Sequence, residues 1–373
     1  MVLTYALTIF GTFLTRSGVV QSVHAFAETD IGEVFLQYLA FILLAACALT
    51  WIRRKELKSE RQIKSFFSRE AAFLLNNLVL LSICFATLWG VLFPIISEAV
   101  TGAKQTVGIP FFNKVNTPLF IALLFLMGAG PMVAWRKATL SSFYKSFLFP
   151  ALASIAVTAA LIASGITSPY PLFSYAMCVF VAATVGVEWK RGLRTVPEKN
   201  ILSRSAKLFT RHRVRYAGYL VHIGVAIAAI GITASMSHKV EKDISLKPEG
   251  SASIGRFNLK LGKANFYSNS NFEAVSIKTD IYSKHSGKFL GTLYPEKRFY
   301  IRNKESTTEV ALRTSLLEDL YIALAGFDSE TNTAFLKVFV NPLQIWLWIG
   351  VFIMVVGTVL ALLPAKTPRR SNG

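Results

Sequence analysis

The sequence predicts a polytopic α-helical membrane protein with about eight spans, the first truncated, and one extracytoplasmic β-rich domain between the last two spans. Three observations predict this fold class. The chain of 373 residues has a mean hydropathy of +0.47 and only 16% charged residues, whereas soluble domains hold about a quarter. Apolar runs long enough to cross a bilayer recur along the chain, and a long polar segment near its end alternates polar and apolar residues.

Seven apolar runs are long enough to cross hydrocarbon about 30 Å thick, which requires about 20 helical residues. They are Val34–Ile52, Ala72–Ile95, Thr117–Trp135, Phe147–Ser164, Leu172–Trp189, Tyr216–Met236 and Leu343–Leu363. An eighth run, Val2–Leu14, is cut short by Met1 and covers only about 20 Å. We interpret it as a truncated helix rather than a secretory signal, because no basic segment precedes it. The chain is therefore expected to be the later part of a longer protein.

The basic residues predict the orientation of these spans. Of the 40 Lys and Arg residues, 22 lie in one alternating set of connections and only three in the short connections of the other set. The other 15 lie in Ser237–Pro342, a long segment of the kind that the positive-inside rule does not govern. Both ends of the chain are therefore expected in the cytoplasm and Ser237–Pro342 outside. The net charge of +19 then reflects topology rather than nucleic-acid binding.

The outer segment Ser237–Pro342, of about 105 residues, is long enough for a small independent domain. Its short alternating runs, separated by turn residues, predict an antiparallel β barrel or sandwich with a helix at each end. The runs are Arg256–Leu261, Phe272–Tyr282, Phe289–Leu293, Arg298–Ile301, Glu309–Arg313 and Ala334–Val340. The predicted organisation is thus a helical bundle over residues 1–236, the β domain over 237–342, a final span over 343–364 and a cytoplasmic tail over 365–373.

The sequence also disfavours several classes of protein. Cys47, Cys84 and Cys178 all lie within apolar runs and form no Cys-x-x-Cys pair, so a disulfide framework, a zinc site and a thiol-redox motif are poorly supported. Few charged residues lie within the spans, and the two halves of the chain show no internal repeat. A transporter or channel is therefore the last-ranked function.

One histidine lies well inside a predicted span. His222 follows Arg215 by seven residues, which places it roughly 10 Å along the helix from the basic end. An ionisable side chain at that depth is costly without a partner, so His222 is a functional candidate. Gly218, Ala226 and Ala229 lie on its face and leave room beside the imidazole for something flat and bulky. The alternative is helix packing through small residues, with His222 hydrogen-bonded to a neighbouring span.

A second histidine, His24, follows the truncated span in a stretch, residues 19–26, with apolar residues at near-helical spacing. We expect this stretch to lie along the outer surface of the bilayer. His24 is then either a polar residue at a wet boundary or an axial haem ligand, since neutral imidazole holds iron in either oxidation state. Arg16 either extends its charge outward to water or meets an anionic ligand such as a haem propionate.

Five segments of the chain share their order with motifs of a known family. They are Gly11–Phe26, Ser68–Asn77, Gly218–Gly224, Tyr294–Tyr300 and Thr307–Ala311. Together they closely resemble the cytochrome c maturation protein F family (CcmF, also named CycK or NrfE), the haem-lyase subunit of cytochrome c assembly systems. The likeness runs from about Leu3 to Pro364, and the shared order makes it strong where one motif alone would be weak.

The resemblance implies roles for both histidines. His24 would be an axial ligand of the haem being delivered, with Arg16 as a candidate propionate contact, and His222 an axial ligand of a resident b-type haem. Quinol would reduce the resident haem, which keeps the delivered iron ferrous while haem is attached through thioethers to an apocytochrome c. The family also implies a haem chaperone and a CcmH-type thioreductase as partners. It implies the bacterial inner membrane, with the β domain in the periplasm, rather than mitochondria; no nucleic acid and no separate catalytic side chain are expected.

The sequence departs from the family in one respect, because the tryptophan-rich loop that cradles the delivered haem is absent. The second histidine of each haem pair would also belong to an earlier half of the protein. The chain is therefore expected to need an N-terminal CcmF half and to be inactive as a haem lyase without it, whether the coding sequence is naturally split or truncated. The alternative function is a non-enzymatic membrane receptor that presents apocytochrome through Ser237–Pro342.

Overall fold

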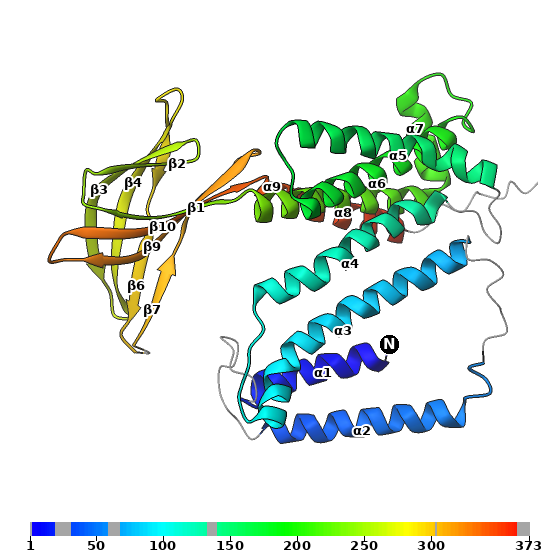
Figure 1. Cartoon of the computed structure of the whole chain (residues 1–373), viewed down its shortest axis with the longest axis horizontal. Coiled ribbons are helices and arrows are strands. Elements are labelled where there is room, and N and C mark those ends of the chain that lie inside the picture. Colours follow the sequence, from blue (N-terminus) through cyan, green and yellow to red (C-terminus); the bar gives the residue numbers. More distant parts are fainter. Residues whose placement is uncertain (1, 19–30, 59–67, 133–139, 303, 364–373) are drawn as a thin grey trace, which may run out of the picture. The chain divides into compact units, whose positions relative to one another are not determined.

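The computed structural model describes residues 2–18, 31–58, 68–132, 140–302 and 304–363 (Figure 1). The predicted ligand His24 lies outside these residues. The described residues divide into two compact units, one up to Phe120 and the other from Ile121 onward.

Seven helices of the described residues are long and apolar enough to cross a membrane, which confirms the predicted fold class. They are α2 (Ile31–Ile52), α3 (Arg69–Thr101), α4 (Ile109–Ala129), α5 (Leu140–Ala163), α6 (Pro169–Leu193), α8 (Arg213–Ser237) and α9 (Gln344–Leu362). The shorter apolar helix α1 (Val2–Arg16) has 15 residues, too few to span alone. Many apolar side chains of these helices are exposed, Leu44 to 71% and Phe352 to 68%, as expected where lipid rather than water is the surrounding solvent.

In the first unit, α1 lies against α2, and the two are linked by the hydroxyls of Tyr5 and Tyr38, 3.1 Å apart. α3 has 33 residues, which is longer than predicted. Its start is set by Ser68, whose hydroxyl accepts a hydrogen bond from the Ala71 N–H at 3.2 Å. Its end is set by Gly102, which adopts the left-handed conformation (φ 72°) that glycine favours at helix ends.

In the second unit, α6 packs against α5 on one side and α8 on another, and α8 also pairs with α9 (Figure 1). A further short helix, α7 (Ile201–Arg211), joins α6 to α8. The predicted elements placed no helix in this connection, because its apolar residues are too few to form a membrane-length run. Asn200 starts α7, since its side chain accepts a hydrogen bond from the Leu202 N–H at 3.0 Å.

The described residues between Val240 and Pro342 form ten strands in two antiparallel sheets, so the β domain is a sandwich rather than a barrel. One sheet has the order β1 (Val240–Leu246), β10 (Thr333–Pro342), β9 (Glu318–Asp328) and β8 (Ala311–Arg313). The other has the order β2 (Ser251–Ile254), β3 (Phe257–Ser268), β4 (Phe272–Ser283), β6 (Glu296–Tyr300) and β7 (Glu305–Glu309), and β5 (Phe289–Leu293) pairs with β4.

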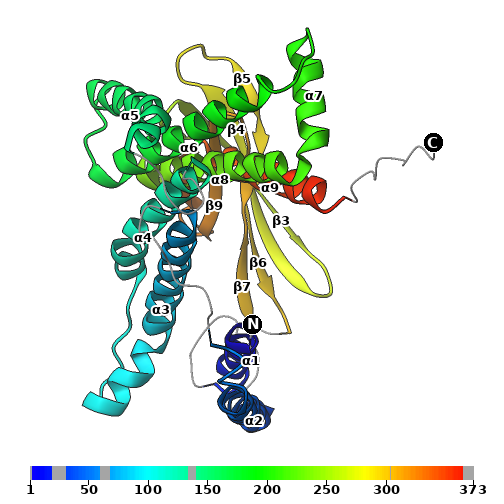
Figure 2. The same cartoon turned by 90° about the vertical axis from the view of Figure 1, so that its right-hand side faces the viewer.

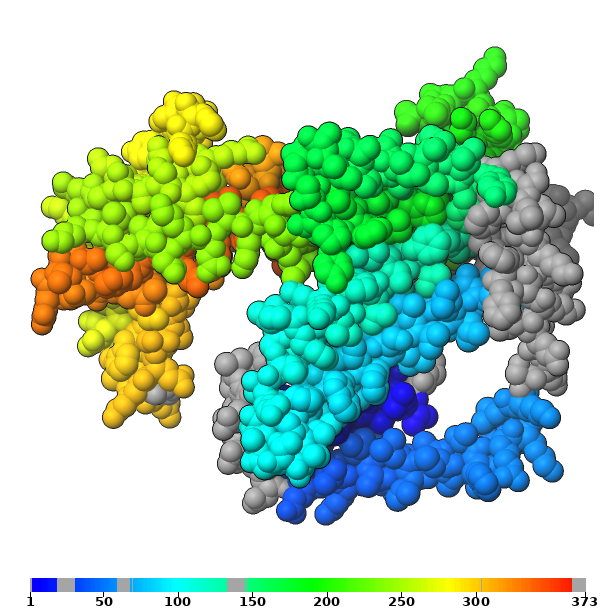
Figure 3. Space-filling view, viewed as in Figure 1, coloured from blue at the N-terminus to red at the C-terminus, as the bar shows by residue number. Residues whose placement is uncertain are grey.

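The core of the sandwich is formed by alternate residues of both sheets. On β9, for example, Leu320, Ile322 and Leu324 are fully buried while the residues between them are more exposed, which is the period of two that one-sided strands require. They pack with buried residues of the other sheet such as Leu259 and Ile281. In Figure 3 the strands form one body from which the hairpin of β6 and β7 extends.

Six of these strands were predicted and four were not. The six predicted runs overlap β3, β4, β5, β6, β8 and β10. The other four are β1, β2, β7 and β9. β7 and most of β1 are exposed, so they lack the apolar alternation that marks a half-buried strand.

The sandwich brings the ends of two membrane helices together. β1 directly follows α8, and β10 directly precedes α9. These strands pair antiparallel from Val240 opposite Val340 to Leu246 opposite Ala334. The pairing of β1 with β10 therefore continues as the pairing of α8 with α9.

Candidate functional site

His222 is the tenth residue of α8 and is partly buried. Its Nδ1 atom is buried and has no hydrogen-bond partner among the described residues. A buried polar atom without a partner costs free energy, which makes this imidazole the strongest functional candidate in the described chain. The alternative prediction, a hydrogen bond from His222 to a neighbouring span, finds no support at Nδ1.

The small residues predicted beside His222 have different surroundings. A Cβ atom at Gly218 would meet no atom of the described residues within 4 Å, apart from its own helix backbone. Ala226 is buried, with 3% exposure, against Leu124 of α4 and Val181 of α6. A Cβ atom would therefore find room at Gly218, whereas neighbouring helices fill the Ala226 side of His222.

The opposite face of α8 is closed by α9. A Cβ atom at Gly350 would lie 2.5 Å from the backbone nitrogen of Ala228 and from the backbone oxygen of Gly224. One at Gly231 would lie 2.7 Å from the backbone nitrogen of Leu347. At about 100° per residue, Gly224 and Gly231 lie about 180–200° around α8 from His222. Close packing of α8 on α9 thus turns His222 away from α9.

Two polar contacts join α8 to α6. Toward the end of α8, the hydroxyls of Ser174 and Thr233 lie 2.6 Å apart. Near the start of α8, a buried carboxylate on α6, that of Glu188, bonds to α8 side chains. His222 lies between these two contacts along α8, so the contacts fix the position of His222 along the axis of the neighbouring helix α6.

The contact near the start of α8 is a charged group that we call the Glu188 cluster: Glu188, Arg191, Arg215 and Tyr219. Arg191 donates to the Glu188 carboxylate at 2.8 Å, and Arg215 forms an ion pair with its other oxygen. The Tyr219 hydroxyl donates to Glu188 at 3.2 Å and accepts from Arg215 at 2.8 Å. The Glu188 side chain is only 7% exposed, so these donors, rather than water, stabilise the negative charge of its carboxylate.

The pairing of Glu188 with Arg191 can be read from the sequence, because the two residues lie three apart on one helix. The pairing of Glu188 with Arg215 cannot, because that contact depends on which spans pack together. A signal was present in the four-residue spacing of Arg215 and Tyr219, which places both on one helix face. Both residues also precede His222 on the same helix.

The candidate propionate contact Arg16 and two further histidines lie at other points of the fold. Arg16 is the last residue of α1, in the other unit of the chain. His238 caps the end of α8, where its ring stacks on Tyr175 at 6.5 Å between centroids. His285 lies in an exposed turn between strands. Among the described residues, no group of three His, Cys, Asp or Glu side chains could hold a metal ion.

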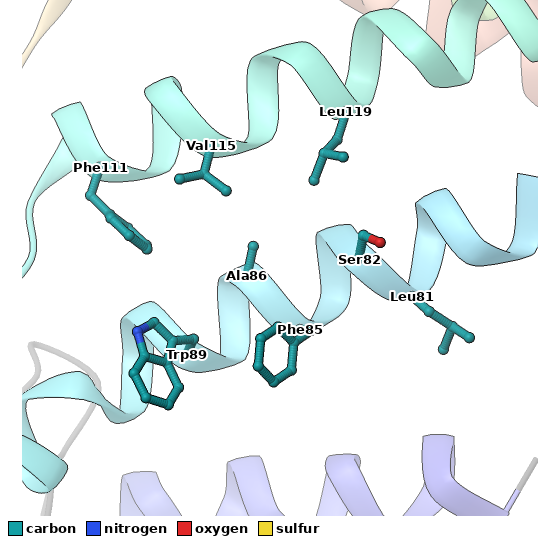
Figure 4. A pocket seen from close by; sticks show the side chains of 8 residues that line it. All are labelled: Leu81, Ser82, Phe85, Ala86, Trp89, Phe111, Val115 and Leu119. Atoms are coloured by element: carbon teal, nitrogen blue, oxygen red, sulfur yellow. The ribbon is translucent and has the colours of Figure 1, made fainter.

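An apolar pocket lies between α3 and α4 (Figure 4). Phe111, Val115 and Leu119 point from α4 toward α3, and Ala86 points back toward them. The pocket has a volume of about 520 Å³ and is lined by apolar side chains except for Ser82. It holds no titratable group, so it can accommodate hydrocarbon but offers no acid, base or metal ligand.

The residues around His222 fit a haem in two respects. The imidazole has a nitrogen without a protein partner, as an axial ligand requires in the protein alone. No described atom outside the backbone of α8 would lie within 4 Å of a Cβ atom at Gly218, one turn from His222, so this position does not obstruct a flat ring. The described residues supply one such histidine, so a second ligand would come from another polypeptide or from outside the described residues.

Comparison with known proteins gives the same family that the motifs resemble. Residues 237–342 match the family model described as the CcmF C-terminal beta-sandwich. The chain is 33% identical over 365 residues to a cytochrome c-type biogenesis protein CcmF of Pseudomonas aeruginosa. It is 30% identical over 364 residues to the cytochrome c-type biogenesis protein CycK of Bradyrhizobium diazoefficiens. Each alignment covers 97% of this chain and 54% of the relative.

A solved structure named Cytochrome c Heme Lyase CcmF has a similar fold, with a TM-score of 0.74 and 23% identity. The match covers 97% of this chain and 54% of that one, so the chain spans about half the length of the relatives that it matches. Residues 237–342 therefore belong to the CcmF C-terminal beta-sandwich family, and the chain as a whole is a relative of the CcmF and CycK proteins of cytochrome c biogenesis.

Proposed function

We propose that this chain forms part of a haem lyase that attaches haem covalently to apocytochrome c. The observation that carries the proposal is the unpartnered imidazole of His222 on a membrane-length helix. The names of the CcmF and CycK relatives and the match of the sandwich to their family model support the same function. Because the chain spans about half of those relatives, the active unit includes an N-terminal CcmF half.

Within this proposal, the imidazole of His222 would hold the iron of a resident b-type haem. When bound, the haem supplies a one-electron carrier that accepts electrons from quinol and keeps the iron of the delivered haem ferrous. The protein's part is to hold the imidazole at a fixed depth and rotation. The close contact with α9 sets the rotation, and the Glu188 cluster and the Ser174–Thr233 contact set the height along α6.

The proposed substrate site lies at the outer surface, where His24 would ligate the delivered haem and Arg16 would meet a propionate. Each thiol of the apocytochrome adds across one vinyl group: a carbon–sulfur bond forms, and the thiol proton passes to the neighbouring vinyl carbon. This addition needs no net oxidant.

The proposed setting is the bacterial inner membrane, with the basic connections in the cytoplasm and the sandwich in the periplasm. A haem chaperone and a CcmH-type thioreductase would meet the sandwich there.

The test of the resident haem is to co-express the chain with the N-terminal half of a relative and to record the reduced haem spectrum of the purified complex. His222→Ala is expected to remove the b-type signal, and added imidazole is expected to restore part of it by filling the vacated position. His285→Ala, in an exposed turn of the sandwich, is the control and should keep the full signal. Full b-type occupancy in His222→Ala would refute the ligand role.

The test of the outer site is cytochrome c maturation in cells that lack their own family member. His24→Ala is expected to abolish covalent attachment while the b-type signal from His222 remains, because the two histidines serve different haems. Normal maturation with His24→Ala would refute its role without affecting the proposal for His222.

A second candidate function is a receptor that presents apocytochrome to the assembly complex. It is favoured by exposed aromatic side chains on the sandwich, where Phe266 is 60% exposed and Phe299 46% exposed. Replacing both by Ser should weaken capture of an apocytochrome peptide and leave the b-type haem in place. Unchanged capture would exclude this surface as the receptor.

A further inference from the structure

Helix α7 has one apolar and one basic face. At about 100° per residue, positions three and four apart share a face. The apolar face holds Ile201, Leu202, Leu208 and Phe209, and Arg204, Lys207 and Arg211 lie together along one side of it. An 11-residue helix with such a division requires something to cover its apolar face.

Among the described residues, only half of that face is covered by protein. Leu208 is 1% exposed, and it packs with Val196 and Tyr216 in a buried cluster that Phe209 also contacts. At the other end of the helix, Ile201 is 65% exposed and Leu202 is 75% exposed. The protein fixes the C-terminal end of α7 and leaves two large apolar side chains uncovered at its N-terminal end.

The surroundings of these two side chains are strongly basic. Residues 190–215 hold nine Lys and Arg residues and one acidic residue, Glu198. Some of this charge is used inside the protein: Lys207 pairs with Glu198 at 2.8 Å, and Arg204 donates to the Val196 carbonyl at 3.0 Å. Four exposed cations have no ion-pair partner among the described residues: Lys190, Arg194, Lys199 and Arg211.

Helix α7 connects the ends of two membrane helices. α6 ends at Leu193 and α8 begins at Arg213, so both ends of α7 are tied to ends of spans. In Figure 2, α7 runs steeply across the direction of α6 and α8. Figure 3 shows its bright green atoms standing out from the surface of the neighbouring helices. A helix that crosses the direction of two spans at their ends lies along the membrane surface.

We infer that residues 190–215 form a surface that binds the headgroups of anionic lipids, with Ile201 and Leu202 inserted among the upper acyl chains. The exposed cations lie at the ends of two spans, where they would meet the negatively charged headgroups of an anionic leaflet. The neighbouring apolar pair would meet the hydrocarbon just below those headgroups. An acidic soluble protein would satisfy the charges, but its approach to Ile201 and Leu202 would compete with the bilayer that surrounds α6 and α8. The lipid surface is therefore the occupant that the position of α7 favours.

The insertion of the apolar pair is tested in the full chain, in nanodiscs of phosphatidylcholine alone or mixed with phosphatidylglycerol. A single environment-sensitive dye is attached through Leu202→Cys after replacement of Cys47, Cys84 and Cys178. In the mixed discs the dye at position 202 should emit at a shorter wavelength than the same dye at position 203, and iodide should quench it less. The matched control is Ser203→Cys, the next residue, which is exposed and lies about 100° around the helix. Equal quenching at both positions would overturn the insertion.

The headgroup preference is tested by energy transfer from the dye at position 202 to acceptor-labelled lipid. Labelled phosphatidylglycerol should associate more strongly than labelled phosphatidylcholine, and added salt should remove the difference. Arg211→Gln should weaken the preference about fivefold, since a cation near an anionic surface contributes about 1 kcal/mol and 1.4 kcal/mol is tenfold. Lys288→Gln, in the sandwich, is the control and should have no effect.

Two results would overturn the inference of a lipid surface. One is equal association of the two labelled lipids at low salt. The other is a dye at position 202 that becomes protected only when an acidic soluble protein is added, which would identify a protein as the occupant.

Discussion

The two faces of α8 use the same kind of small residue for opposite purposes. On the α9 side, Gly224 and Gly231 let two helix backbones touch, and a Cβ atom at Gly350 would meet backbone at 2.5 Å. On the other side, Gly218 leaves space that no described atom beyond its own helix backbone fills, beside an imidazole with an unpartnered nitrogen. A glycine in a span therefore marks either a close helix contact or room for a ligand, and only its surroundings distinguish the two.

The difference follows from the solvent. Lipid gives no hydrophobic force between helices, so α8 and α9 associate through van der Waals contact at close range. The same lipid offers no hydrogen bond to His222, so its unpartnered nitrogen remains costly until a ligand uses it. One face of α8 thus carries the stability of the pair, and the other carries the candidate site.

The largest effect is expected when the closed face is opened. Gly350→Leu places side-chain atoms where backbone atoms of α8 now lie, so the two helices must separate. We expect a loss of about 3 kcal/mol, the upper end of the cost of overpacking, measured by equilibrium unfolding of the solubilised chain. Gly218→Ala, which meets open space, is the control and should cost nothing; it should raise the free energy of unfolding by up to about 1 kcal/mol, because Ala has the higher helix propensity. Equal costs at the two positions would contradict the distinction between the faces.

The next largest effect is expected at the Glu188 cluster. Glu188→Ala leaves Arg191, Arg215 and the Tyr219 hydroxyl without their shared acceptor. Both guanidinium groups are about half exposed and can turn to water, so we expect a loss of about 2 kcal/mol, below the 3–5 kcal/mol of a fully buried pair. Glu198→Ala removes a surface ion pair with Lys207 and should change unfolding little. If α8 is positioned by this cluster, Glu188→Ala should also shift the reduced haem spectrum of the co-expressed complex.

Much of the fold was predictable from single residues and their spacing. The spans followed from apolar runs, since few side chains other than apolar ones are tolerated in lipid. β9 was missed although Leu320, Ile322 and Leu324 alternate within it, so its signal was present in the sequence. α7 was missed in the same way. Its apolar residues are few, but they are helically spaced, so the signal for a helix was present in the sequence.

The candidate site was predictable only in part. The depth of His222 follows from counting residues along one helix, and that prediction needs no knowledge of packing. The pairing of Glu188 with Arg215 and the closed face opposite His222 depend on which helices are neighbours, and single-span patterns do not contain that information. Gly218 and Gly350 both lie within membrane-length helices, and only the packed structure shows which of them meets another helix.

A smaller effect is expected at the second contact between α6 and α8. Ser174→Ala removes the hydrogen bond between its hydroxyl and that of Thr233, 2.6 Å apart. We expect a loss of about 0.6 kcal/mol, which is the average for such bonds between membrane helices. Ser82→Ala, whose hydroxyl bonds only within its own helix, is the control. A loss above that of Glu188→Ala would show that this end, rather than the Glu188 cluster, holds α8 against α6.

The smallest effect is expected where the α8–α9 pair continues into the sandwich. Glu241 of β1 accepts from Lys337 of β10 at 2.8 Å, and this bond lowers the pKa of the Glu241 carboxyl below its usual value. A carboxyl whose pKa is lowered in the folded state stabilises that state above its unfolded pKa and loses this contribution as pH falls through the folded value. Hydrogen exchange of β1 and β10 in the full chain should therefore quicken slightly on acidification through the carboxylate range. Glu241→Gln should remove part of that acceleration, whereas an unchanged pH dependence would mean that β1 and β10 are held by their backbone ladder and core alone. In that case the sandwich would join α8 to α9 independently of pH.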